Sequence, residues 1–188
     1  MVTFEQLNLP ISLQKAIDDL GFTTPTPIQS KAFPIVMSGR DVMGIAQTGT
    51  GKTAAYALPI LMRCKYAQGK NPRTLILAPT RELVMQIHEV MVGLAVETDL
   101  RILALYGGLG PKTQIQALEA GIDILVSTPG RFLELYRKDA IVVKELKILI
   151  LDEADKMMDM GFMPQIREIL EKIPYKKRQN GLFSATFP

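Results

Sequence analysis

The 188-residue sequence contains one cysteine, one histidine and no tryptophan. A single cysteine, Cys64, cannot form an internal disulfide and supplies no metal-ligand cluster, which is typical of a protein in a reducing cytoplasm. No apolar segment approaches the roughly 20 residues that span a bilayer. The first residues also lack the basic start and apolar core of a signal peptide. These absences predict a cytoplasmic protein with no membrane contact.

The composition indicates one folded domain. Hydrophobic residues make up 47% of the chain and charged residues 22%, which is the range of globular proteins. We find no internal repeat, low-complexity tract or linker, so residues 1–188 are expected to form a single domain, and a monomer. The formal net charge of +3 permits a phosphate-backbone partner without requiring one.

Short apolar runs alternate with longer amphipathic segments. The runs are nearly continuous in Ile, Leu, Val and Ala, as expected for strands buried on both faces of a parallel sheet. They occupy residues 41–46, 74–78, 102–106, 122–127, 146–151 and 181–184. Between them, apolar residues recur at helical spacing, for example within 83–94 and 166–173. The alternation predicts an α/β fold, with a mostly parallel central sheet flanked by helices on both faces and ligands at the carboxyl ends of the strands.

A phosphate-binding loop is predicted at residues 46–53, Ala-Gln-Thr-Gly-Thr-Gly-Lys-Thr, between the first apolar run and a helical segment. Gly49 and Gly51 permit a tight turn whose amides can face an anion. Lys52 stands at a helix N-terminus, where the dipole disfavours a cation unless a polyphosphate neutralises it. Thr53 offers a hydroxyl to Mg²⁺. The alternative is a Gly/Thr-rich turn with an incidental lysine.

Three carboxylates, Asp152, Glu153 and Asp155, follow directly on the apolar run that ends at Leu151. Crowded carboxylates repel one another unless a cation compensates them, and Mg²⁺ bridging nucleotide phosphates is the expected cation. Asp152 would hold the metal, partly through water, and Glu153 would orient the attacking water. The alternative is a solvated acidic cap on the next helix.

These residues bring a family into view, because Asp152 to Asp155 spell the signature of the DEAD-box RNA helicases. The sequence resembles that family over nearly its whole length, with the motifs in family order. The matching segments are Phe4, the Q motif at 21–29, the P-loop at 46–53, motif Ia at 79–83, the glycine doublet at 107–108, motif Ib at 128–131, the DEAD motif and motif III at 184–186.

The resemblance implies a RecA-like domain that uses ATP and Mg²⁺. It implies that Phe4 stacks on adenine and that Gln29 reads the adenine edge, for which a side-chain amide offers the matching donor and acceptor. The alternatives are core packing for Phe4 and an exposed helical glutamine for Gln29. The expected catalytic residues are Lys52, Asp152 and Glu153, with Thr53 and Asp152 at the metal. The expected nucleotide-binding residues are Phe4, Phe22, Thr24, Gln29, Gln47, Thr48, Gly49, Thr50, Gly51, Lys52, Thr53, Asp152 and Glu153.

RNA contacts are expected in three segments that follow apolar runs. These residues suit phosphates and sugars rather than base edges, so binding should be largely independent of sequence. The alternative is that they are loop and cap residues of the fold, as Thr80 would be if it capped its helix. The expected RNA-binding residues are Pro79, Thr80, Arg81, Gly107, Gly108, Thr128, Pro129, Gly130 and Arg131. Ser184 and Thr186 are expected to couple the nucleotide site to domain closure through a hydrogen bond to Asp155.

The family's second RecA-like domain, which carries the arginine fingers, has no counterpart in this sequence. We therefore expect an isolated N-terminal domain that binds nucleotide, hydrolyses it poorly and does not unwind RNA alone. Three other functions are compatible with parts of the sequence: another P-loop NTPase, a DNA translocase, and a non-catalytic RNA-binding or scaffold module. The Q motif and motif III oppose the first, the DEAD spelling opposes the second, and measurable nucleotide affinity would exclude a pure scaffold.

Overall fold

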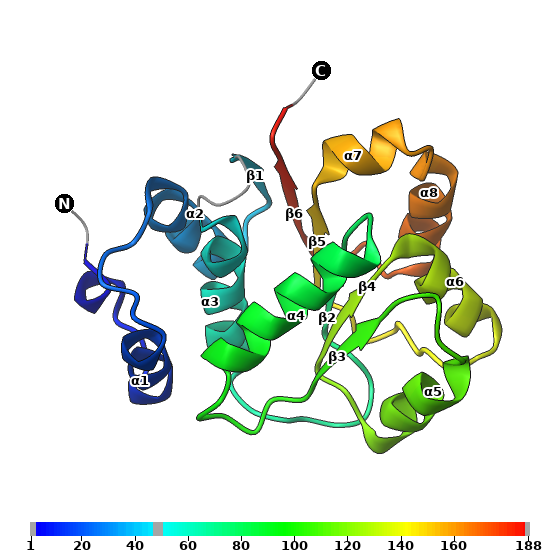
Figure 1. Ribbon diagram of the computed structural model, residues 1–188, viewed down its shortest axis with the longest axis horizontal. Helices are drawn as coiled ribbons and strands as arrows, with labels where there is room; N and C mark the ends of the chain where they lie inside the picture. The colour runs from blue at the N-terminus through cyan, green and yellow to red at the C-terminus, as the bar shows by residue number, and fades with distance from the viewer. Residues whose placement is uncertain (1–2, 47–50, 187–188) are drawn as a thin grey trace.

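The computed structural model describes residues 3–46 and 51–186 and contains a six-stranded sheet (Figure 1). All six strands are parallel, and their order across the sheet is β1-β6-β5-β2-β4-β3. They occupy Val42–Ile45 (β1), Thr74–Leu77 (β2), Ile102–Leu105 (β3), Ile124–Ser127 (β4), Ile148–Asp152 (β5) and Gln179–Ser184 (β6). Each predicted apolar run overlaps a strand, although β5 ends one residue later and β6 begins two residues earlier than predicted, so the α/β fold of RecA-like type is confirmed.

Helices connect the strands, and several begin with sequence signals that fix their first turn. A capping box formed by Thr26 and Gln29 starts the second helix, and Thr80 caps the fourth by accepting a hydrogen bond from the Leu83 N–H. The helices are Ile11–Asp19 (α1), Pro27–Met37 (α2), Lys52–Cys64 (α3), Arg81–Leu94 (α4), Pro111–Ala120 (α5), Pro129–Arg137 (α6), Ala154–Asp159 (α7) and Met163–Lys172 (α8), preceded by a 3-10 turn at Glu5–Leu7 (η1). Within the described part of the chain, no helix is both long and apolar enough to cross a membrane.

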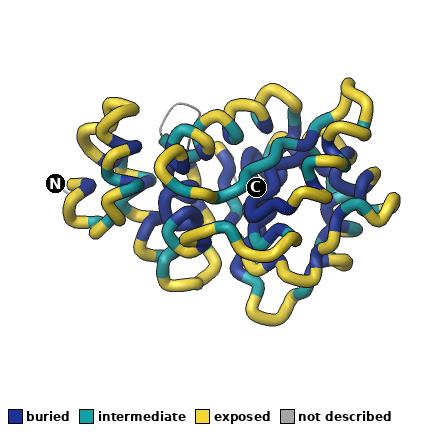
Figure 2. Tube along the Cα trace, turned by 90° about the horizontal axis from the view of Figure 1, so that it is seen from below, coloured by how far each residue is buried: buried dark blue, intermediate teal, exposed yellow. Residues whose placement is uncertain are grey.

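The helices form two layers, one on each face of the sheet, as predicted. Along β2, Ile76 packs into a core with α1 to α4, whereas its neighbours Leu75 and Leu77 pack into a second core with α5 to α8. Period-two alternation along β2 therefore serves both cores. Figure 2 shows the buried stretches running through the middle of the molecule, with exposed turns outside them.

Because the strands are parallel, their carboxyl ends meet at one edge of the sheet. The predicted P-loop follows β1, the DEAD motif spans the end of β5, and motif III spans the end of β6. These three strands are neighbours. The predicted RNA segments follow β2, β4 and β3, which are the other three neighbours. The strand order thus assigns the two sets of motifs to adjoining halves of one edge.

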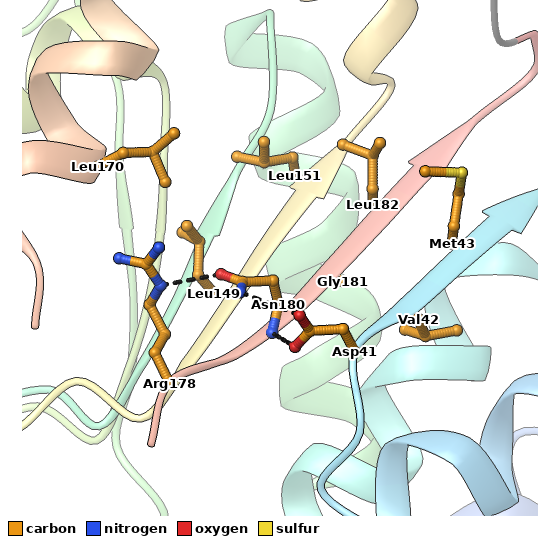
Figure 3. Close-up of a pocket in the computed structure, with 10 residues that line it drawn as sticks. All are labelled: Asp41, Val42, Met43, Leu149, Leu151, Leu170, Arg178, Asn180, Gly181 and Leu182. Carbon is orange, nitrogen blue, oxygen red and sulfur yellow. Dashed lines mark hydrogen bonds between the residues drawn. The ribbon is translucent and has the colours of Figure 1, made fainter. Parts of the chain in front are cut away.

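One part of the sheet is less covered than the rest. On β1, Met43 and Ile45 are 67% and 66% exposed. A groove of about 440 Å³ lies beside them, and Figure 3 shows Met43, Leu182 and Leu151 next to one another on three neighbouring strands. The lower rim is polar and ordered, since Asn180 accepts a hydrogen bond from Arg178 at 2.9 Å and donates its backbone N–H to Asp41 at 2.7 Å (Figure 3).

Candidate functional site

The predicted phosphate-binding lysine lies against the predicted metal-binding carboxylate. Lys52 is the first residue of α3, and Gly51 before it adopts a left-handed φ of 78°. The Lys52 Nζ lies 2.8 Å from Asp152 Oδ1 and 3.8 Å from Glu153 Oε1. The sequence predicts that a cation at this helix end needs a polyphosphate to neutralise it. In the structure the two carboxylates already supply negative charge, and a nucleotide would have to share or replace them.

Asp152 and Glu153 are not a solvated helix cap. The Asp152 side chain is 0% exposed, and it accepts hydrogen bonds from the Glu153 N–H at 2.8 Å and the Tyr56 hydroxyl at 2.6 Å. Glu153 is also buried, and its left-handed φ of 52° is strained for a residue with a side chain. Its second carboxylate oxygen pairs with the exposed Lys156 at 3.2 Å. The two carboxylates are therefore held by specific donors rather than by water.

Tyr56 is a site residue that sequence reasoning missed. It is fully buried, and burial together with the Asp152 charge and hydrogen bond raises the pKa of its phenol well above the ordinary value. A signal was present in the sequence, because Tyr56 stands four residues after Lys52 and so lies on the same face of α3. Nothing in the spacing, however, identified Asp152 as its partner.

Gln29 contacts the P-loop directly. It is buried, its Nε2 donates to the Gly51 carbonyl at 3.1 Å, and its Oε1 accepts from the Thr26 N–H at 3.0 Å. The exposed-glutamine alternative is therefore wrong. The left-handed φ of Gly51 favours glycine there, and a Cβ at this position would also displace the Gln29 amide. One amide hydrogen and one lone pair of Gln29 remain available to a base.

A cleft of about 530 Å³ brings several predicted residues together. It joins the Q motif, the start of α3 and Glu153 to one side of α4, which sequence reasoning did not include in the site. The lining residues are Phe22, Thr24, Thr26, Gln29, Gly51, Lys52, Thr53, Ala54, Leu83, Gln86, Glu89, Val90 and Glu153. Gln47, Thr48, Gly49 and Thr50, which we predicted to bind phosphate, lie outside the described residues.

Phe4 is placed apart from this cleft. Its side chain is 4% exposed and belongs to the core, against which Leu7 and Leu9 pack. It borders a separate hollow of about 400 Å³ that Phe22 also lines. The structure thus has the core packing that we gave as the alternative. Adenine stacking by Phe4 stays a prediction, and it requires the ring to leave this packing.

The chemistry of the donor set suits Mg²⁺ carried by a nucleotide. Asp152 and Thr53 offer hard oxygen donors, which Mg²⁺ prefers, and Mg²⁺ commonly uses one or two protein carboxylates with phosphates and water. Among the described residues, no group of three or more His, Cys, Asp or Glu could hold a metal on its own. The residues fit a metal that arrives with phosphate ligands, and Asp152 and Thr53 are the ones that would hold it.

Motif III is hydrogen-bonded to the DEAD motif. The Asp155 N–H donates to Ser184 Oγ at 3.1 Å, and the Thr186 hydroxyl donates to Asp155 Oδ2 at 3.2 Å. Burial acts to raise the pKa of Asp155, but hydrogen bonds from Ser184, the backbone and Thr186 outweigh it and lower that pKa. The structure contains the predicted contact, while its role in coupling remains a prediction.

The segments after β2 and β3 meet at the candidate RNA surface. The Arg81 guanidinium lies over the Tyr106 ring, 4.8 Å from its centroid. Gly107 and Gly108 are exposed, and Gly108 adopts a left-handed φ of 89° beside the Arg81 side chain. Thr80 caps α4, as the structural alternative proposed, and it is half-buried, whereas Pro79 before it is buried. Contact of Pro79 and Thr80 with RNA stays a prediction.

Motif Ib, after β4, is more internal than predicted. Pro129 and Arg131 are buried, whereas Gly130 is exposed and Thr128 is half-buried. The Arg131 guanidinium donates to the carbonyls of Tyr106, at 3.0 Å, and Leu109, and to Glu134 at 3.1 Å. Arg131 therefore holds the loop that carries the glycine doublet. Direct contact of Arg131 with RNA stays a prediction that these hydrogen bonds do not favour.

Comparison with known proteins agrees with this arrangement. A family model described as DEAD/DEAH box helicase matches residues 26–188. The chain is 44% identical to "ATP-dependent RNA helicase DeaD" of Haemophilus influenzae, over 100% of this chain and 30% of that protein. It is 42% identical to "DEAD-box ATP-dependent RNA helicase 52A" of Oryza sativa subsp. japonica, over 98% of this chain and 34% of that protein. It is 44% identical to "DEAD-box ATP-dependent RNA helicase 30" of Arabidopsis thaliana, over 100% of this chain and 32% of that protein.

The chain thus spans about a third of the length of these curated relatives. The match covers the Q motif, the P-loop lysine, the DEAD carboxylates and motif III, which are the residues that meet in the site. The chain belongs to the DEAD/DEAH box helicase family.

Proposed function

We propose that this chain is the N-terminal RecA-like domain of an ATP-dependent RNA helicase, in which it binds ATP or ADP with Mg²⁺ and grips the RNA backbone. The observation that carries the proposal is the contact of Lys52 with Asp152, beside a cleft in which Gln29 touches Gly51. The residues proposed to bind phosphate, metal and adenine come from distant parts of the chain and lie at one place, which supports the proposal. A reducing cytoplasm is the expected compartment, and the lone buried Cys64 supports it.

Each residue of the site would have a separate role in nucleotide binding and hydrolysis. Lys52 at the start of α3 would bind the outer phosphates, and Asp152 and Thr53 would orient the metal that accompanies them. When bound, Mg²⁺ would neutralise charge on the phosphates. Glu153 would accept a hydrogen bond from the attacking water and orient it. Gln29 would use its remaining donor and acceptor for the adenine edge, which offers the complementary pair, whereas guanine offers two acceptors.

RNA would lie across the other half of the same edge. Arg81 and the exposed glycines 107 and 108 offer a cation and backbone amides, which suit phosphates and sugars rather than bases. Ser184 and Thr186 would couple the nucleotide site to domain closure through their hydrogen bonds with Asp155. We propose that a second RecA-like domain of the complete protein supplies further RNA contacts and the arginine fingers. Such fingers are worth roughly 10³–10⁵ in rate, so this domain alone should turn over slowly and not unwind RNA.

The proposal is tested by equilibrium binding of a fluorescent ADP with Mg²⁺, competed by ATP, GTP and CTP. We expect ATP to compete best, and Gln29→Ala to remove that preference while binding persists. Gln116→Ala, which changes an exposed glutamine on α5, is the matched control and should behave as wild type. Absence of nucleotide binding by a folded sample would exclude the proposal. Equal competition by all three nucleotides would keep the phosphate site and remove the role of Gln29.

A further inference from the structure

The hydroxyl of Tyr56 has no role in the functions assigned so far. Tyr56 lies on α3 and is fully buried, and its ring packs against Phe183 of β6 with centroids 5.1 Å apart. Its Oη donates to Asp152 Oδ2 at 2.6 Å. Tyr56 does not line the cleft that Gln29, Lys52 and Glu153 share. Its hydroxyl reaches the site through Asp152, and the side chain of Thr53, which lines the cleft, also acts on the phenol by hydrogen bonding.

Packing does not explain this hydroxyl. A phenylalanine would fill the same space against Phe183, and it would bury no polar group. Burying a hydroxyl costs free energy unless it finds a hydrogen-bond partner, and here the partner is a carboxylate that is itself closed to water. A tyrosine at this position is explained by the needs of Asp152 rather than by the core.

The two oxygens of Asp152 have separate partners. Oδ1 accepts from Lys52 Nζ and from the Glu153 N–H, both at 2.8 Å. Oδ2 accepts from Tyr56. Donors on both oxygens fix the rotation of the carboxylate. In this orientation Oδ1 faces Lys52, which lines the cleft.

We propose that Tyr56 is a positioning residue that holds the Asp152 carboxylate with Oδ1 directed at the cation. The inference rests on the proposed role of Asp152 in binding nucleotide with Mg²⁺. Without the hydroxyl, Oδ2 lacks its donor in a place that water does not reach, and only the donors to Oδ1 restrict the rotation of the carboxylate. Residues that orient a metal ligand in this way typically contribute about 10- to 100-fold to metal affinity or activity.

The test is Tyr56→Phe, which keeps the ring and removes only the hydroxyl. Affinity for fluorescent ADP is measured twice for each protein, with Mg²⁺ and with EDTA. We expect Tyr56→Phe to weaken ADP binding about 10- to 100-fold with Mg²⁺ and to leave binding in EDTA unchanged. Tyr136→Phe is the matched control, since Tyr136 stacks on Phe132 in the other core, and it should resemble wild type in both conditions.

A second variant separates positioning from a general loss of structure. Asp152→Asn removes the carboxylate that Tyr56 holds, so adding Tyr56→Phe to Asp152→Asn should cause no further loss of Mg²⁺-dependent affinity. An equal loss with Mg²⁺ and with EDTA, or a further loss in the double variant, would overturn the inference. So would a Tyr56→Phe protein that binds as wild type does. If wild type binds no ADP in either condition, the proposed function fails first and this inference fails with it.

Discussion

Replacing Lys52 with methionine removes the cation from a buried ion pair and keeps most of the side chain's apolar stem. The Nζ lies 2.8 Å from Asp152 Oδ1, and the two side chains are 7% and 0% exposed. At an effective dielectric constant near 20, unit charges at this separation attract by about 6 kcal/mol, part of which the loss of hydration offsets. The substitution leaves Asp152 buried without its cation. We therefore expect the free energy of unfolding to fall by about 3–5 kcal/mol.

Thermal unfolding followed by circular dichroism measures this loss in the nucleotide-free protein. For a domain of this size, the expected fall in Tm is roughly 6–20 °C. Lys15→Met is the matched control, because Lys15 pairs with Glu97 at a similar distance of 3.1 Å but with the side chains 61% and 37% exposed. An exposed pair contributes about 1 kcal/mol or less.

Mg²⁺ provides a second readout for the same variant. Because Lys52→Met leaves Asp152 without a close cation, excess Mg²⁺ should restore part of the lost Tm, and EDTA should abolish the recovery. Wild type should respond less, since Lys52 already occupies Asp152 Oδ1. A Lys52→Met protein as stable as the Lys15→Met control would refute the reasoning. It would mean that the Tyr56 hydroxyl and the Glu153 N–H suffice to hold the buried carboxylate.

Three further predictions follow from other parts of the molecule. Hydrogen bonds from Arg101, Gln68 and Arg73 outweigh burial and lower the pKa of Asp123 to about 2 from its ordinary 3.8. Its contribution to stability is therefore complete above that ordinary value and is lost as the pH falls through 2, so acid unfolding curves should be flatter for Asp123→Asn than for wild type. In the complete protein, changing Ser184 and Thr186 together to alanine should abolish unwinding and retain ATPase activity, and unchanged unwinding in a duplex-displacement assay would remove their coupling role. Met43→Ser, at an exposed position on β1, should change stability by no more than about 0.5 kcal/mol, whereas Leu149→Ala in the second core should cost about 2–5 kcal/mol in denaturant unfolding.

The strands and their motifs could be predicted from sequence because each depends on local patterns. A strand buried on both faces needs a nearly continuous apolar run, and 74–77 and 148–151 contain little else. The polar motif that follows each run then falls at the carboxyl edge for topological reasons alone. For the same reason Lys52 and Asp152, which are 100 positions apart, could be assigned to one site before their distance was known.

Side-chain pairings within that site could not be predicted, because they depend on tertiary packing. Gln29 was assigned to adenine from its amide chemistry, yet its contact with Gly51 depends on how α2 lies against α3. Phe4 carries no pattern that separates a stacking ring from a core ring, and the structure places it in the core. Tyr56 was not predicted as a site residue, since nothing in the sequence shows which residue its hydroxyl contacts.

Arg81 and Arg131 were both predicted to contact RNA, but the structure gives them different surroundings. The exposed Arg81 lies on Tyr106, whereas the buried Arg131 donates to the carbonyls of the loop that follows β3. A cation that neutralises a single-stranded phosphate contributes about 0.7 to the slope of log K against log salt concentration. Arg81→Met should therefore reduce the salt dependence of RNA binding by about this amount, and Arg131→Met should weaken binding without changing the slope.

Arg131→Lys distinguishes the two roles further. A lysine keeps the charge but cannot reproduce the planar set of donors that reaches Tyr106, Leu109 and Glu134, so it should fail as methionine does. Fluorescence titration of a labelled single-stranded RNA at several salt concentrations measures both slope and affinity. Equal losses of slope for Arg81→Met and Arg131→Met, with recovery by Arg131→Lys, would mean that Arg131 leaves its loop carbonyls to meet a phosphate. The loop after β3 would then be reorganised by RNA, rather than held ready for it by Arg131.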